Sequence, residues 1–330
     1  MSRADRRGLS TQHSLLSTRS LLSTRFRGRA WRETRSFYLF IAPWLIGFVA
    51  LNLIPLVLGF ATSLTNYDGF NLDNLKFRGL GNYARIFADD DVFYSFGRTL
   101  LYTAVNVPLG IALALALAML LNQALVGRGF FRTLFYLPHI IPIVAVVWIW
   151  RIFLDQNFGI LNAMISLFRP DTGIRWLVDY PTQVLVGLSL WTGAGGGMVI
   201  FLAGLQGIPS ELKEAARIDG ANAWGVFRHV TLPLLTPVVF FQLILSSIGS
   251  LQVLVAPMLL TGTQLGALPP RDNYFYVVHV YQQVFANQRF GYGTALLWLL
   301  FLVIVLLSAL VFRSSRYWVY YEVDQEGAKP

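Results

Sequence analysis

Long intervals without charge divide this sequence and limit what it can fold into. A helix that crosses a bilayer needs about 20 consecutive, predominantly apolar residues. Six charge-free intervals reach or approach that length, and the third is the shortest, with 18 residues. The pattern predicts an all-α, polytopic membrane protein with six transmembrane helices. The intervals lie between Arg35 and Asp68, Arg98 and Arg128, Arg132 and Arg151, Asp179 and Glu211, His229 and Arg271, and Arg289 and Arg313.

Composition independently supports a location in a lipid bilayer. Hydrophobic residues make up 55% of the 330 residues and charged residues only 13%, which is too apolar for an ordinary soluble domain. The chain contains no cysteine. Disulfide frameworks, thiol nucleophiles and cysteine metal sites are therefore excluded together.

Loop charges predict the orientation of the spans, because short loops rich in Lys and Arg stay cytoplasmic. Residues 1–35 contain nine Arg against two acidic residues, whereas the loop after the first interval contains five Asp against three basic residues. Both termini are therefore predicted to be cytoplasmic. The fourth connection, at about residues 206–232, is predicted to lie on the same side.

Residues 1–35 are predicted to form a basic, disordered tail, in which residues 14–19 repeat as residues 20–25. This Arg- and Ser-rich, acid-poor segment resembles a mitochondrial transit peptide, but we interpret it as a cytoplasmic polybasic tail attracted to anionic lipid. The net charge of +9 comes largely from this tail, so it implies no nucleic-acid partner. A second cytoplasmic tail is predicted at residues 314–330.

A polar segment at about residues 206–232, which we call the knuckle, separates the fourth and fifth intervals. Leu212, Ala215 and Ile218 recur near helical spacing and predict a short helix. Asp219 and Gly220 are expected to end it, because glycine accepts the left-handed backbone conformation that closes helices.

A second short helix is expected from about residue 221 to residue 229, with Trp224 and Phe227 one turn apart. Pro233 lies where a new membrane helix would start. The two helices would project from the membrane and dock on a partner surface through these aromatic anchors. The alternative is an ordinary amphipathic loop lying on the lipid headgroups.

The pattern QxIPxELxEAAxIDGA at residues 206–221, followed by TLPLL at residues 231–235, resembles the EAA loop of binding-protein-dependent ABC importer permeases. The sequences GNY at 81–83, FYLP at 135–138 and FGY at 290–292 are similar to the carbohydrate-uptake branch of that family. The resemblance covers roughly residues 36–313 and implies a type I ABC importer permease core in a prokaryotic inner (plasma) membrane. It implies that the knuckle contacts a separate ATPase through Glu211, Glu214, Ala215, Ala216, Asp219, Gly220, Trp224 and Phe227.

The resemblance also implies the partners of the chain. These are a second, homologous permease subunit, two ABC ATPase subunits that bind ATP and Mg, and an extracellular or periplasmic solute-binding protein. Whether the two permeases are identical stays open.

No catalytic site is predicted in this chain. Lys76, Lys213 and Lys329 all lie outside any glycine-rich phosphate loop, so ATP hydrolysis is assigned to another subunit. The four histidines are scattered, and His139 is interpreted as structural rather than as a ligand. We expect no cofactor and no metal bound by this chain.

Polar residues inside the spans are the candidates for a substrate pathway, because hydrocarbon penalises them unless they face a cavity or another helix. Uncharged groups beside an aromatic ring suit a neutral polyhydroxy solute, which favours a sugar or polyol. The alternative is helix packing through small and hydroxyl side chains. The glycine run at 193–197 is also expected to weaken its helix. The candidates are Trp191, Thr192, Gly193, Gln242, Ser246 and Ser250.

Two other functions stay open. A glycerol phosphate importer would need cationic groups near the pore, and the best-placed arginine is Arg151, at the outer end of the third interval. A membrane channel or scaffold that works without nucleotide would have no ATPase partner. After residue 261 the glycine-rich, proline-ended turn usual in the family is replaced by GTQLG at 262–266, which leaves the solute subclass open.

Overall fold

The computed structural model describes residues 34–71, 73, 75–123, 126–169, 173–260 and 269–320. The chain divides into two units, residues 1–61 and 62–330, which are described separately. Most of the predicted basic tail and the 262–266 turn lie outside the described residues. In the first unit a helix begins at Thr34 and contains a π-helical turn, η1 (Val49–Leu53), before α2 (Ile54–Ser63). Pro55 explains this turn, because proline has no N–H for the regular helical hydrogen bond.

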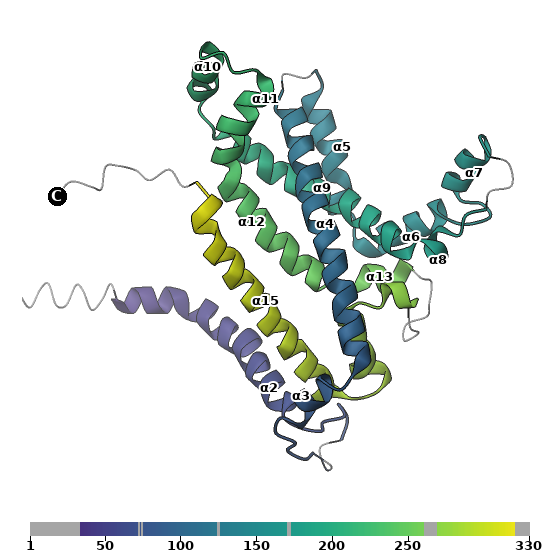
Figure 1. The fold of residues 1–330 in the computed structure, drawn as a ribbon. Coiled ribbons are helices and arrows are strands. Elements are labelled where there is room, and N and C mark those ends of the chain that lie inside the picture. The colour runs from purple at the N-terminus through teal and green to yellow at the C-terminus, as the bar shows by residue number, and fades with distance from the viewer. Residues whose placement is uncertain are drawn as a thin grey trace, which may run out of the picture. The chain divides into compact units, whose positions relative to one another are not determined.

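Three long helices form the centre of the second unit: α4 (Asp90–Asn122), α9 (Pro181–Gln206) and α12 (Leu232–Leu251). They contact one another in every pairwise combination and lie side by side in Figure 1. The last long helix, α15 (Phe290–Trp318), packs on α12 and continues past the predicted boundary at residue 313. The predicted all-α fold is confirmed, since the described residues form helices and one isolated bridge.

Five helices are long and apolar enough to cross a membrane, and a bent pair provides the sixth candidate. That pair is α5 (Arg128–Ile140) and α6 (Ile143–Phe153), whose axes differ in direction by 99°. The third predicted span therefore corresponds to a bent pair of helices and not to one straight helix. Ile141 is extended, as residues before proline prefer, and Pro142 cannot donate the hydrogen bond that would continue α5.

The glycine run in α9 allows close packing and does not interrupt the helix. The expected weakening is wrong, because α9 is continuous from Pro181 to Gln206. A Cβ added at Gly195 would lie 2.4 Å from the carbonyl oxygen of Phe135, and one added at Gly196 would lie 2.8 Å from the His139 ring. The glycines therefore let the backbone of α5 and its histidine lie directly on α9.

The sequence predicted that the second knuckle helix would end before the fifth span begins. In the structure it does not end there. One helix runs from Ala223 to Leu251, through α11 (Ala223–Val226), η2 (Phe227–Thr231) and α12. Leu232 donates its N–H to the carbonyl of Phe227, which is π-helical spacing. This wider turn accommodates Pro233, so the helix continues where a new start was predicted.

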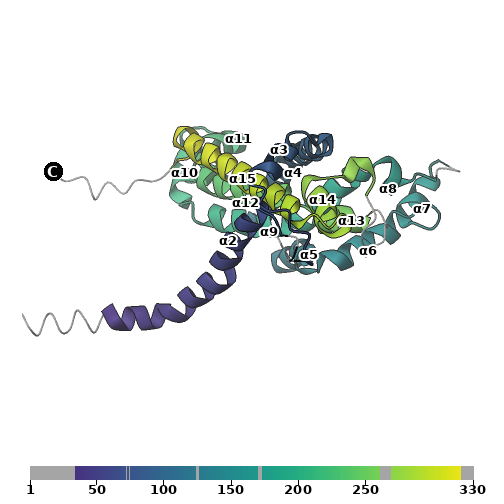
Figure 2. The same ribbon diagram turned by 90° about the horizontal axis from the view of Figure 1, so that it is seen from below.

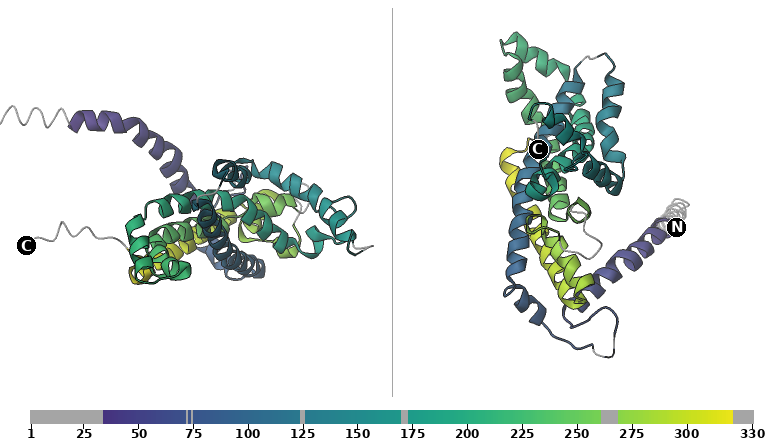
Figure 3. Two further views of the ribbon diagram at one scale, coloured as in Figure 1. Left: turned by 90° about the horizontal axis from the view of Figure 1, so that it is seen from above. Right: turned by 90° about the vertical axis from the view of Figure 1, so that its right-hand side faces the viewer.

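Short helices surround the ends of the long ones. Figure 1 and the right-hand view of Figure 3 show α10 and α3 at opposite ends of the second unit, with α4 running between them, and Figure 2 views the unit from the side on which α3 lies. A helix of 33 residues is about 50 Å long. The knuckle and the acidic 62–91 segment are thus a membrane thickness apart. The short elements are α3 (Gly81–Ile86), α7 (Ile160–Ser166), α8 (Trp176–Asp179), α10 (Ser210–Ile218), α13 (Val255–Leu260), η3 (Arg271–Asn273), α14 (Tyr276–Tyr281) and η4 (Gln282–Ala286).

Candidate coupling knuckle and polar cavity

The first knuckle helix, α10, ends where the sequence predicted. Gly220 adopts a left-handed φ of +88°, and Ala221 donates its N–H to the carbonyl of Ala216 at 2.9 Å. Asp219 likewise donates to the carbonyl of Ala215 at 3.0 Å. Glycine closes the helix here because a left-handed backbone carries no steric penalty for it.

The knuckle presents most of its predicted contact residues to the surroundings. In α10 no residue is buried, and Glu211, Glu214 and Ala215 are exposed. Ile218 is 86% exposed beside these charges, although its spacing predicted a packed apolar stripe. Trp224 is 64% exposed, and its ring centroid lies 5.3 Å from that of Phe227. Large exposed apolar side chains next to carboxylates are typical of a protein contact surface.

The knuckle is joined to the bundle by continuous helix. Asn222 caps α11 by accepting a hydrogen bond from the N–H of Gly225 at 2.8 Å, and α10 contacts both α11 and η2. Because η2 continues directly into α12, a displacement of the knuckle moves the start of α12 with it.

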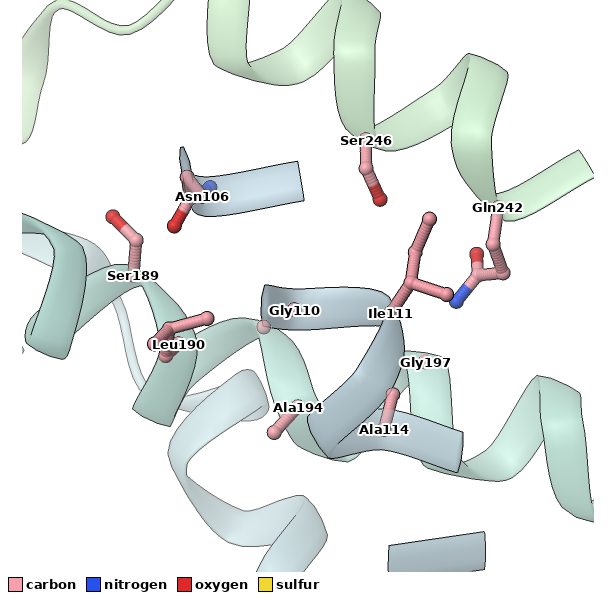
Figure 4. Close-up of a pocket in the computed structure, with 11 residues that line it drawn as sticks. Asn106, Gly110, Ile111, Ala114, Ser189, Leu190, Ala194, Gly197, Gln242 and Ser246 are labelled. Carbon is pink, nitrogen blue, oxygen red and sulfur yellow. The ribbon is translucent and has the colours of Figure 1, made fainter. Parts of the chain in front are cut away.

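A polar cavity of about 80 Å³ lies between α4, α9 and α12 (Figure 4). Three of the predicted pathway residues line it: Gly193, Gln242 and Ser246. On the α9 side, Ser189 and Gly193 are four residues apart and therefore share a face. The remaining lining residues are Asn106, Gly110, Ile111, Ala114, Leu190, Ala194 and Gly197.

Gly197 brings α4 and α12 close to α9 at one end of this cavity. A Cβ added at Gly197 would lie 2.8 Å from Cβ of Ala114 and 2.8 Å from Nε2 of Gln242. The side chain of Gln242 therefore rests on the glycine, where it is buried. The last glycine of the run thus packs against two helices other than α5.

Asn106 is a cavity residue that the sequence analysis missed. Its Nδ2 donates to Ser250 Oγ at 3.2 Å. Ser250, a predicted pathway residue, therefore contacts a lining residue but does not line the cavity itself. Its Oδ1 is buried and has no hydrogen-bond partner among the described residues. An asparagine in the middle of a charge-free interval is a signal that could have identified it, because buried amides in membranes need partners.

The other two predicted residues lie on a different face of α9. Trp191 is 40% exposed, and its ring lies 6.1 Å from that of Trp150 in α6. The hydroxyl of Thr192 donates to the Leu188 carbonyl, while the Thr192 carbonyl lies 3.1 Å from Nδ1 of His139. The six predicted residues therefore do not form one site.

Six candidate spans, an exposed knuckle and a polar cavity within the bundle define a polytopic membrane protein of the permease type. The family of binding-protein-dependent transport system inner membrane components matches residues 106–319. The chain belongs to this family, and it is a multi-pass inner-membrane protein. The resemblance on which the sequence analysis relied is thereby confirmed.

Individual relatives agree with the family match. The chain is 36% identical over 300 residues to the probable ABC transporter permease protein YesP of Bacillus subtilis, covering 89% of this chain and 95% of YesP. It is 31% identical over 283 residues to the lactose transport system permease protein LacF of Rhizobium radiobacter, covering 84% and 93%. It is 31% identical over 281 residues to AmyD of Thermoanaerobacterium thermosulfurigenes, a probable permease for starch degradation products, covering 83% and 91%.

A solved structure shares the fold. A chain of a bacterial ABC transporter that imports the acidic polysaccharide alginate superposes with a TM-score of 0.74 at 21% identity, covering 87% of this chain and 98% of that one.

Proposed function

We propose that this chain is the membrane-spanning subunit of an ABC importer that moves a sugar or related polyol inward. ATP hydrolysis on a separate subunit, docked at the knuckle, drives the movement. The observation that carries this proposal is the continuous helix from Ala223 to Leu251, which joins the exposed knuckle to the wall of the polar cavity. A motion imposed on α11 reaches the pathway along one helix, and α10 is linked to that helix by the Gly220 turn and by its contacts with α11 and η2.

The proposed arrangement has both termini and the knuckle in the cytoplasm. An odd number of crossings would place the knuckle and the amino terminus on opposite faces, so the bent α5–α6 pair has to count as one crossing. The acidic 62–91 segment would then face outward, where a solute-binding protein delivers its ligand. A second, homologous permease and two ATPase subunits, which bind ATP and Mg, complete the assembly. We assign the ATPase site to those two subunits and expect no cofactor on this chain.

The uncharged lining favours a neutral solute. Asn106, Gln242 and Ser246 offer amide and hydroxyl groups that pair with sugar hydroxyls. Relatives named for lactose and starch products support the same class. A phosphorylated solute would need a cationic group in the cavity lining. Arg151, the arginine considered for this role, lies in α6 outside the lining, with its guanidinium stacked 4.6 Å above the Trp148 ring.

The cavity is small for a sugar in this conformation. At about 80 Å³ it admits several waters, whereas ligand pockets start at about 300 Å³. A solute would pass only if α4, α9 and α12 separated, or along the exposed Trp191 face. Both routes fit alternating access, in which one state is closed. A complete switch between two states needs about 5.5 kcal/mol of differential binding, which nucleotide and binding protein together can supply.

Reconstitution of the complete transporter in proteoliposomes tests the proposal. We expect uptake of a labelled neutral oligosaccharide that requires ATP, the ATPase subunits and the cognate solute-binding protein together. Uptake that persists without nucleotide would support the channel alternative instead. Uptake of glycerol phosphate in preference to every neutral sugar would refute the proposed solute class.

Replacing Trp191 by Ala is expected to raise the KM for uptake about 3- to 10-fold, because aromatic contacts contribute about 0.5–1.5 kcal/mol. Trp191→Phe should keep most of the affinity, since it retains an aromatic face. Leu306→Ala, at an exposed position of α15, serves as the control. An unchanged KM in Trp191→Ala would remove this residue from the pathway.

Replacing Glu214 by Lys is expected to reduce coupled uptake at least 10-fold, because the change reverses an exposed charge on the proposed docking surface. Membrane insertion should be unchanged, since the side chain contributes nothing to the core. Initial uptake rates and copurified ATPase are the two readouts. Arg228→Lys, at an exposed position in η2, is the charge-conserving control. Normal uptake with a full complement of ATPase would contradict the proposed docking surface.

A further inference from the structure

Helix α14 packs between α4 and α15 at the end of the unit opposite the knuckle. The backbone N–H of Tyr276 donates to the hydroxyl of Thr99 in α4 at 2.8 Å. The hydroxyl of Tyr276 donates to the carbonyl of Leu296 in α15, also at 2.8 Å. One turn further along, His279 is completely buried at this α4–α14–α15 joint.

With the amide oxygen of Gln282 facing Tyr274, the hydrogen bonds around His279 favour one tautomer. Its Nδ1 lies 2.7 Å from the hydroxyl oxygen of Tyr274, whose own proton is donated to Gln282 Oε1 at 2.6 Å. Because the hydroxyl has only one proton, the Nδ1–H of His279 is the donor to Tyr274. Nε2 then carries a lone pair, and it is buried without a hydrogen-bond partner among the described residues.

The unpartnered Nε2 faces a carboxylate. Asp89 Oδ2 lies 4.0 Å away and accepts a hydrogen bond from the Tyr292 hydroxyl at 2.8 Å. Asp89 Oδ1 accepts from the N–H of Asp91, so this carboxylate also caps α4. Arg271 is a cation whose charge acts on His279, and it pairs with Asp91 at 2.7 Å. The titratable groups facing His279 are thus Asp89 and Asp91 of the α4 start, Arg271 and Tyr274 before α14, and Tyr292 of α15.

Two opposing effects act on a proton at Nε2. Burial lowers the pKa of His279 below its usual 6.5, while the charges of Asp89 and Asp91 act in the opposite direction and only partly offset this. The buried ring is therefore neutral near pH 7. Below about pH 6.5 an exposed histidine binds a proton more readily than this buried one, so acid favours states in which the ring is exposed.

We propose that His279 is a proton-binding site, and that its protonation loosens the α4–α14–α15 joint. The neutral ring is buried in the joint, where Tyr274 of the same segment holds it, and its unpartnered nitrogen is the point at which a proton enters. Acidification would thereby bias this end of the bundle toward a more open arrangement. The inference does not depend on the solute. Only the compartment whose pH is sensed rests on the proposed topology.

The absence of cysteine from the chain makes a direct distance measurement practical. Ala88 and Ala286 are exposed and flank the joint, so both are replaced by Cys and spin-labelled in the complete transporter in nanodiscs. We expect the distance distribution between the labels to lengthen or broaden as the pH falls from about 7.5 to about 5, with a midpoint below about 6.5. An unchanged distribution would overturn the proposal.

Three variants separate titration of His279 from a purely structural role. His279→Gln keeps a hydrogen-bonding side chain that does not titrate, and should abolish the pH response. Asp89→Asn keeps the helix cap, and should increase the opening at pH 5 because the carboxylate that stabilises the imidazolium inside the closed joint is removed. His229→Gln, at an exposed position in the knuckle, should leave the response intact. A response that persists in His279→Gln, or a smaller pH response in Asp89→Asn than in the unsubstituted protein, would contradict the proposal.

Discussion

Replacing Gly220 by Pro is expected to abolish ATP-driven uptake while the protein still inserts into the membrane. Gly220 has a φ of +88°, whereas proline is restricted to about −65°. The substitution also removes the N–H that donates to the Arg217 carbonyl at 3.1 Å. The turn between α10 and α11 cannot form with proline, so α10 would be displaced from η2 and α12. We expect uptake to fall at least 100-fold, measured beside the ATPase activity of the same proteoliposomes.

Graded substitutions at Gly220 provide the control. A Cβ at this position meets no atom within 4 Å, so side-chain size alone is tolerated. Gly220→Asn should retain most of the uptake, because asparagine visits left-handed conformations at low cost, while Gly220→Ala should lose about 1–2 kcal/mol of turn stability. Equal uptake by Gly220→Pro and the unsubstituted protein would show that the turn has no part in coupling.

Replacing Gly195 by Ala is expected to have the second large effect, on both stability and transport. The new Cβ would lie 2.4 Å from the carbonyl oxygen of Phe135 and 2.8 Å from Cα of Tyr136. These are backbone atoms, so α5 has to move away from α9. Overpacking of this kind typically costs about 1–3 kcal/mol. Thermal unfolding in detergent should show a clearly lowered midpoint, and uptake should fall at least 10-fold.

Gly193→Ala is the matched control, two residues away in the same helix. A Cβ at Gly193 meets no atom within 4 Å, and replacing a helical glycine by alanine usually stabilises by about 0.5–1 kcal/mol. The two substitutions should therefore change stability in opposite directions. If both raise the unfolding midpoint, the close packing of α5 on α9 is wrong.

Local chemistry explains which elements could be predicted from the sequence. The spans follow from charge-free intervals, and the end of α10 follows from Gly220, whose left-handed conformation depends on its neighbours in sequence alone. The π-turn before Pro233 and the break before Pro142 were missed, although both prolines were visible. A proline marks a disturbed helix, but whether the helix widens, bends or stops is decided by what packs against it.

The cavity could be predicted only in part, because its walls come from three distant segments. Gln242 and Ser246 were found from their spacing on one helix. Asn106 and Ser250 are far apart in sequence and meet only in the folded bundle. The glycine run at 193–197 predicted a weakened helix. The local sequence does not reveal that the backbone of α5 occupies the space that a side chain at Gly195 would need. Hydrophobic periodicity and helix propensity do not reveal tertiary contacts of this kind.

The central claim, that the knuckle is cytoplasmic and contacts the ATPase, is tested most directly by labelling a single cysteine at Ile218. This side chain is 86% exposed, and the chain contains no other cysteine. A membrane-impermeant maleimide is applied to right-side-out and inside-out vesicles, with and without the ATPase subunit. We predict labelling of Ile218→Cys only from the cytoplasmic face, and strong protection when the ATPase is bound. Labelling from the outer face, or labelling that the ATPase leaves unchanged, would contradict the account.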